Sequence, residues 1–105
     1  MSGTRSIRVV PSAARAIKEA AEWWASNRPK APQAFREELE SALHLIASQP
    51  MVGARARNLK LKGVRRIHLA RVHYHLYYRV NLEPGTIEVL ALWHTSRGKG
   101  AASLE

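Results

Sequence analysis

The chain has 105 residues, of which 46% are hydrophobic and 24% charged, so we expect one globular domain over residues 1–105 rather than a disordered or fibrous protein. It contains no cysteine, which excludes disulfide bridges and thiolate sites, and its longest apolar run, 89–93, is far below the roughly 20 residues that span a bilayer. Seventeen Lys and Arg against eight acidic residues, all of them Glu, give a formal net charge of +9, which favours an anionic partner.

The first half of the chain predicts one strand and two helices. Residues 6–10 form a short β-branched run that Pro11 ends, and Ser12 is a candidate N-cap for the first helix. After an Asn-Arg-Pro break, a second helix is expected with Pro32 in its first turn, and it ends before 49–50. Because the link between them is short, the two helices are expected to form an antiparallel hairpin.

The second half predicts three strands, because the hydrophobic period changes from 3.6 to 2. Residues 64–69 are a candidate strand, and 72–80 alternate clearly between apolar and polar positions. A turn over 81–86 leads to 87–93, which is apolar on both faces and therefore reads as a central strand. The predicted fold is α+β in the order β-α-α-β-β-β, with the helical hairpin packed on one face of a four-stranded, mainly antiparallel sheet. The opposite, open face is where function is expected.

The two ends of the chain carry little structural information. The first six residues lack the apolar core of a signal peptide, so we expect a cytoplasmic protein with no membrane partner. Residues 98–105 are small, polar and basic, and we expect a flexible tail there.

Four of the five histidines are predicted to gather on the open face. Matching apolar positions pairs Val80 with Ile87 and Tyr74 with Trp93, with Trp93 pointing to the helices, and the same logic pairs Ile67 with Tyr74. The other face then pairs arginine with glutamate and histidine with histidine: Arg79 with Glu88, and His73 with His94. The resulting cluster contains four histidines, two arginines and a tyrosine: His68, His73, His75, His94, Arg66, Arg79 and Tyr77.

Three interpretations of this cluster remain open. Arginine donates bidentate hydrogen bonds, histidine moves protons near neutral pH and tyrosine stacks on bases, so the cluster can be a phosphate-handling surface. His73 and His75 could bind a metal with a third imidazole, but there is no Asp to orient the rings and the cations oppose a divalent ion, so we expect no metal and no cofactor. The third interpretation is a set of hydrogen-bonded surface histidines without a catalytic role.

Two further features point to partners. Six cations and no acid lie between residues 55 and 66, which is either a solvated basic surface or a binding site for a polyanion. Trp23 and Trp24 are adjacent on the first helix, so one ring is expected in the core and the other on a half-exposed surface that can mark an interface. We predict that the residues contacting the target or nucleic acid are Arg55, Arg57, Lys60, Lys62, Arg65, Arg66, His68, His73, Tyr77 and Arg97.

Several short motifs, each unspecific alone, follow one another between residues 7 and 97. They are PSAA at 11–14, NRP at 27–29, IASQPMVG at 46–53, GVRR at 63–66, YHLYYRV at 74–80 and LWHTSR at 92–97. In this order and spacing they resemble the RelE/ParE superfamily of type II toxin–antitoxin toxins. The resemblance implies a small basic toxin, of the kind that stabilises plasmids, which a cognate antitoxin neutralises by wrapping around it in a hetero-oligomer.

The resemblance implies two alternative activities. RelE-like toxins cut messenger RNA on the ribosome with basic side chains, and here the catalytic residues would be His94, Arg79 and His75; ParE-like toxins are not nucleases and poison DNA gyrase. His75 stands where RelE-like toxins usually carry Arg, and a histidine is mostly neutral at pH 7. No aromatic residue follows Arg97, and the Gly-x-Arg at 63–65 fits ParE better. We therefore favour a ParE-like gyrase poison over a ribosome-dependent endoribonuclease; a degenerate toxin that only binds its antitoxin is a third possibility.

Overall fold

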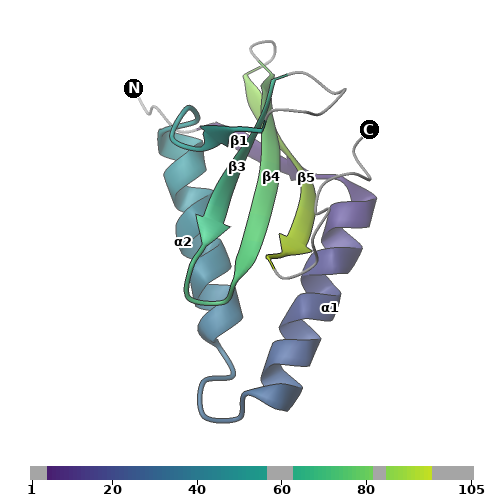
Figure 1. Cartoon of the computed structure of the whole chain (residues 1–105). Helices are drawn as coiled ribbons and strands as arrows, with labels where there is room; N and C mark the ends of the chain where they lie inside the picture. Colours follow the sequence, from purple (N-terminus) through teal and green to yellow (C-terminus); the bar gives the residue numbers. More distant parts are fainter. Residues whose placement is uncertain (1–4, 57–62, 82–84, 96–105) are drawn as a thin grey trace.

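The computed structural model describes residues 5–56, 63–81 and 85–95 (Figure 1). The elements are β1 (Ser6–Val9), α1 (Pro11–Asn27), α2 (Ala34–Ser48), β2 (Ala54–Arg55), β3 (Val64–Leu69), β4 (Tyr74–Asn81) and β5 (Thr86–His94). They form a five-stranded mixed sheet in the order β1-β5-β4-β3-β2, in which β1 runs parallel to β5 and the other neighbours are antiparallel. The predicted α+β class is confirmed, with one more strand than expected because two residues after α2 pair with β3.

Both helices begin at different residues from those predicted. α1 starts at Pro11, and its N-cap is Val10 without a side-chain hydrogen bond, so Ser12 is inside the helix and does not cap it. Proline suits this first position because its fixed φ is helical and its missing N–H has no partner there anyway. α2 starts at Ala34, so Pro32 precedes the helix instead of lying in its first turn.

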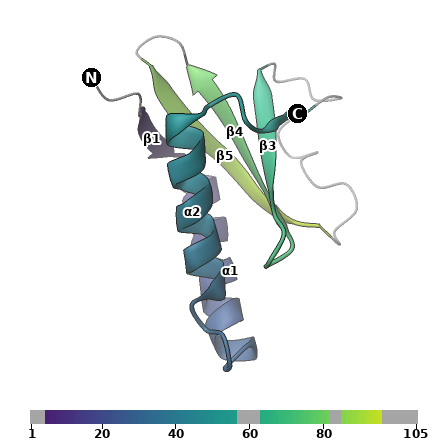
Figure 2. The ribbon, with the colours of Figure 1, turned by 90° about the vertical axis from the view of Figure 1, so that its left-hand side faces the viewer.

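The two helices cover one face of the sheet. Figure 2, turned by 90° from Figure 1, shows α1 and α2 on the same side of β3, β4 and β5. The largest fully buried side chains lie in the layer between helices and sheet: Tyr78, Phe35, Ile46, Leu69, Leu76, Ile87, Val72 and Val89. Neither helix in the described part of the chain has the length and hydrophobicity that crossing a membrane requires.

Tyr78 fixes the segment after α2 to the sheet. Its hydroxyl donates to the carbonyl of Pro50 at 2.8 Å and accepts from the N–H of Gly53 at 2.9 Å. Burial raises the pKa of Tyr78 above its ordinary value, which keeps the donating proton in place. A Cβ at position 53 would lie only 2.6 Å from this hydroxyl, so the contact requires glycine. Arg65 donates to the Gly53 carbonyl at 2.7 Å and closes the same segment from the other side.

A β-bulge changes the register halfway along the β4–β5 hairpin. The predicted pairs Val80–Ile87 and Arg79–Glu88 are confirmed, but the pairing shifts between Tyr78, which faces Val89, and Tyr77, which faces Ala91. The extra residue is Leu90. An inserted residue reverses which face the following side chains occupy. Every residue of β5 beyond the bulge therefore lies on the opposite face from the one predicted.

Candidate functional site

The open face of the sheet is defined here by the polar and aromatic side chains of β3, β4 and β5 that point away from the helices. The register places on it Arg66, His68, His75, Tyr77, Arg79, Glu88 and Trp93. In the β3–β4 hairpin the observed pairing is Ile67 with Leu76, two residues from the predicted partner. A slip of two preserves the faces, so Arg66 and His68 keep their predicted side of the sheet.

The centre of the open face is a cross-strand histidine pair. His68 and His75 are directly opposite each other, and their rings lie 5.0 Å apart, edge to face. His68 is exposed and His75 half-buried. Burial first, then the positive charge of Arg66 and the neighbouring His68, lower the pKa of His75 below its ordinary value. The His75 imidazole is therefore neutral at pH 7, where it can accept a hydrogen bond but cannot supply the fixed cation that an arginine would.

Tyr77 is not available for stacking on a base. Only 4% of the surface of Tyr77 is exposed. The residue belongs to a second apolar cluster with Val64, Leu90 and Ala91, and Trp93 packs against this cluster. The open face is thus less polar at its centre than the alternating sequence suggests. The bulge contributes to this, since it brings Ala91 and Trp93 to a face that uninterrupted alternation would have given to Leu92 and His94.

Arg79 is held by an acid. Its guanidinium donates to Glu88 at 3.0 Å, and Arg8 of β1 lies 3.8 Å from the same carboxylate. Hydrogen bonds from Arg79 and Asn81 lower the pKa of Glu88, with the positive charge of Arg8 acting in the same direction. The carboxylate therefore stays ionised near neutral pH and offsets the positive charge of Arg79.

The predicted four-histidine cluster does not form. His94 faces Tyr74 across the strands, with the two rings 5.1 Å apart, and so lies on the helix side of the sheet beyond the bulge. His73 precedes β4 and sits in the turn with a φ of 65°. The predicted faces of Trp93 and His94 are exchanged. Trp93 pairs with His75 on the open face, and His94 lies on the helix side. Only His68 and His75 of the four meet on the open face.

The predicted basic surface is divided among several places. Arg55 is exposed on β2, and Arg66 is exposed on β3 next to the histidine pair. Arg65 instead points to the segment after α2, where it donates to the carbonyls of Gly53 and Met51. The remaining cations of the prediction lie outside the described residues: Arg57, Lys60, Lys62 and Arg97.

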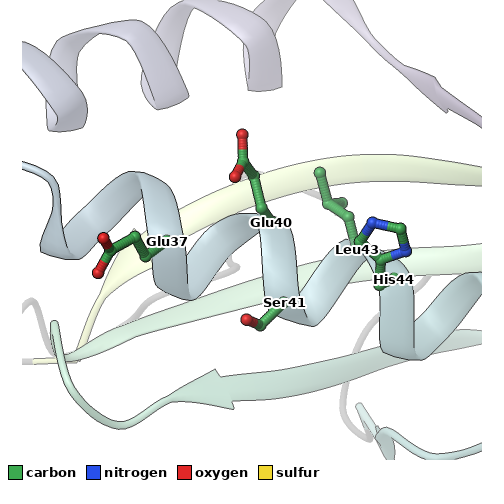
Figure 3. Close-up of a pocket in the computed structure, with 5 residues that line it drawn as sticks. All are labelled: Glu37, Glu40, Ser41, Leu43 and His44. Carbon is green, nitrogen blue, oxygen red and sulfur yellow. The ribbon is translucent and has the colours of Figure 1, made fainter.

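The outer surface of α2 has the opposite charge. Figure 3 shows the residues that line a depression of about 600 Å³ there: Glu37, Glu40, Ser41, Leu43 and His44. The fifth histidine thus lies among acids, on a different layer from the open face. In the described ranges, no three His, Cys, Asp or Glu residues come together in a way that could hold a metal ion.

Comparison with known proteins places the chain in a family. The family model described as the ParE toxin of the type II toxin–antitoxin system parDE matches residues 7–98. The chromosomal ParDE system of P. aeruginosa has a TM-score of 0.66 at 18% identity, covering 87% of this chain and 96% of that chain. The RelBE2 toxin–antitoxin complex of Mycobacterium tuberculosis has a TM-score of 0.62 at 23% identity, covering 87% and 98%. A free mutant form of E. coli RelE has a TM-score of 0.60 at 20% identity, covering 91% and 88%. Curated protein sequences give no significant match.

Proposed function

Because the chain belongs to the ParE toxin family of type II toxin–antitoxin systems, we propose that it stops growth by binding and poisoning DNA gyrase and does not cut RNA. In this proposal it is a binding protein, held inactive in the cytoplasm by its cognate antitoxin in a hetero-oligomer. Solved structures with the same fold include toxin–antitoxin complexes, which supports an antitoxin as the first partner.

The observation that carries the proposal is the separation of the three residues that a ribonuclease would need. His75 lies on the open face, and His94 lies on the helix side of the same sheet. Arg79 is on the open face, but its charge is offset by Glu88 at 3.0 Å. General acid–base cleavage needs donors and acceptors within hydrogen-bond reach of one phosphate. Groups on opposite faces of a sheet do not meet this requirement, which favours a toxin that acts by binding.

We propose that target binding uses the exposed basic residues of β2 and β3. Arg66 and His68 are exposed on the open face, and Arg55 is exposed on β2, where its pairing with Arg65 places it on the other face of the sheet. Exposed arginines can pair with carboxylates or phosphates of the gyrase–DNA complex. Arg57, Lys60, Lys62 and Arg97 belong to the same proposal and lie outside the described residues. Arg65, His73 and Tyr77 contribute less directly, since the first is bonded to main-chain carbonyls, the second is in the turn and the third is buried.

Two assays on one purified sample test the function. In the first, gyrase supercoils plasmid DNA in the presence of increasing toxin; in the second, ribosomes programmed with a defined messenger RNA receive the same toxin. We expect gyrase-dependent DNA cleavage and intact RNA. Normal gyrase activity at saturating toxin, with RNA cut at codon positions, would establish the ribonuclease instead. No effect in either assay would indicate a toxin that has kept only its antitoxin binding.

Matched variants sharpen the result. Arg66→Gln should weaken gyrase poisoning, because it removes an exposed cation of the open face, whereas Arg15→Gln removes an exposed cation from α1 and should not. His94→Ala should leave gyrase poisoning unchanged. If His94→Ala and His75→Ala each abolish toxicity while both variants remain folded, the proposed mode of action is wrong.

A further inference from the structure

A pocket of about 390 Å³ lies between the end of α1 and the far end of the sheet, away from the open face. Helix α1 supplies Trp23 and Trp24 to its lining, and Arg28, the residue directly after the helix, adds its guanidinium. The β3–β4 turn and the adjoining strand ends supply the rest: Val72, His73, Tyr74 and His94. The lining therefore contains three large aromatic rings, two imidazoles and one guanidinium, and it contains no acidic residue.

The α1 side of the pocket is an arginine stacked on indoles. The guanidinium carbon of Arg28 lies 5.1 Å from the ring centre of Trp23 and 5.6 Å from that of Trp24. Trp24 donates its indole N–H to the Ala31 carbonyl at 2.8 Å, which fixes this ring against the loop that follows the helix. Trp23 keeps 47% of its surface exposed. The pocket thus presents an apolar indole face beside a fixed positive charge.

The sheet side of the pocket is rigid. Phe35 packs edge to face against Tyr74 at 5.4 Å, and Tyr74 packs in the same way against His94 at 5.1 Å. The turn is tied at both ends, because the N–H of His73 donates to Leu69 at 2.8 Å and its carbonyl accepts from Thr95 at 2.9 Å. A site whose side chains are already ordered loses less conformational entropy when a ligand binds.

The composition of the lining distinguishes a protein partner from nucleic acid. Trp, Tyr and Arg are the residues most enriched at the energetic centres of protein interfaces. Nucleic acids are held mainly by several Lys or Arg that neutralise successive phosphates, and this pocket offers one arginine and no lysine. Since the lining has a positive charge, an apolar surface and no acid, the ligand that complements it combines an apolar side chain with a carboxylate.

We propose that this pocket is a docking site for the antitoxin, which places an apolar side chain on the indole of Trp23 and a neighbouring carboxylate on Arg28. The antitoxin is the acidic partner that charge complementarity favours for a toxin with a net charge of +9. The inference rests on membership of a toxin–antitoxin family and is independent of the proposed action on gyrase. The antitoxin segment that binds therefore carries an apolar side chain for Trp23 and, next to it, a carboxylate for Arg28.

Affinity for the cognate antitoxin tests the site. Trp23→Ala and Arg28→Gln, two exposed positions whose change leaves the core intact, should each weaken the complex about thirtyfold, as expected at interface hot spots. His73→Gly keeps the positive φ and removes the imidazole, and it should weaken the complex severalfold. Arg15→Gln, with the same loss of charge at an exposed position of α1, should not change it. Antitoxin affinity equal to wild type in both Trp23→Ala and Arg28→Gln would overturn the proposal, whatever the gyrase assays show.

Indole N–H signals of the isolated toxin test the chemistry of the ligand. A capped Asp-Leu-Phe-Glu peptide should shift the signals of Trp23 and Trp24 but not that of Trp93, which lies on the open face and is the internal control. The matched Asn-Leu-Phe-Gln peptide should bind at least tenfold more weakly, and Arg28→Gln should remove this difference. Equal shifts with both peptides, no shift with either, or a stronger response to adenosine monophosphate would each contradict the proposal.

Discussion

The two faces of the sheet differ in what determines the position of their side chains. On the helix side, Leu76, Tyr78 and Ile87 are fully buried, and packing fixes each of them. On the open face, Arg66 and His68 are exposed, and only their partners across the strands restrict them. The difference implies that the helix side supplies most of the stability of the fold, whereas the exposed positions of the open face are free to carry function. The bulge at Leu90 is where residues of β5 change from one role to the other.

The largest expected effect on stability comes from a substitution on the helix side of the sheet. Leu76→Ala removes a side chain with 0% exposure and should lower the free energy of unfolding by about 2–5 kcal/mol, because it leaves a cavity. His68→Ala, on the open face of the neighbouring strand, should change it by no more than about 0.5 kcal/mol. Urea denaturation of both variants measures the contrast. Equal losses would mean that the two faces do not differ as described.

A smaller effect is expected where the segment after α2 meets Tyr78. Gly53→Ala adds a Cβ that would lie 2.6 Å from the Tyr78 hydroxyl and 2.8 Å from the Arg66 carbonyl. The strain and the displaced hydrogen bonds should reduce stability by about 1–3 kcal/mol. Ala54→Ser, an addition of similar size at the next, exposed position, is the control and should be near neutral. Wild-type stability of Gly53→Ala would contradict the close packing at this point.

The open face should contribute a pH dependence through His75. The pKa of His75 is lowered in the folded protein, so below about 6.5, its ordinary value, the unfolded chain binds a proton that the folded chain does not. The free energy of unfolding should therefore fall as pH drops below this value, and the contribution should be fully present above it. His75→Gln should flatten this part of the curve, measured by denaturation between pH 5 and 8.

NMR titration of the His75 ring can separate the causes of its lowered pKa. Arg66→Gln and His68→Gln should each raise the pKa of His75, and Arg66→Gln should raise it more because its charge is the larger of the two influences. Because burial is the main cause, neither variant should restore the ordinary value. A His75 pKa that does not respond to Arg66→Gln would show that the guanidinium is not beside the imidazole.

The smallest effect is expected at the Arg79–Glu88 pair. The arginine side chain is 32% exposed, so the pair is partly screened by solvent, and Arg79→Gln should reduce stability by about 1 kcal/mol or less. The more exposed pair of Arg71 with Glu37, at 3.2 Å, is the comparison, and Arg71→Gln should have a still smaller effect. Thermal unfolding at low and high salt checks both, since salt should reduce the two contributions.

The spacing of apolar residues was enough to predict the element order, the helical hairpin and the half of the last hairpin in which Val80 pairs with Ile87. It could not locate the bulge, because residues 87–93 are apolar on both faces and carry no period that marks an inserted residue. The register of the preceding hairpin was missed because its loop has four residues and includes His73 in a left-handed conformation. Two residues are too few for the strand β2 to show a pattern. The candidate site was predicted least well, because the face on which His94 lies depends on the register beyond the bulge.

The proposed mode of action depends on His94 and His75 lying on opposite faces of the sheet. Nuclear Overhauser effects between aromatic rings measure this arrangement directly. The bulge predicts contacts of the Tyr74 ring with the His94 imidazole, which lie 5.1 Å apart, and of the His75 ring with the Trp93 indole. A hairpin without the bulge would instead bring the Tyr74 ring against Trp93. Contacts of that second kind would return His94 to the open face and contradict the account.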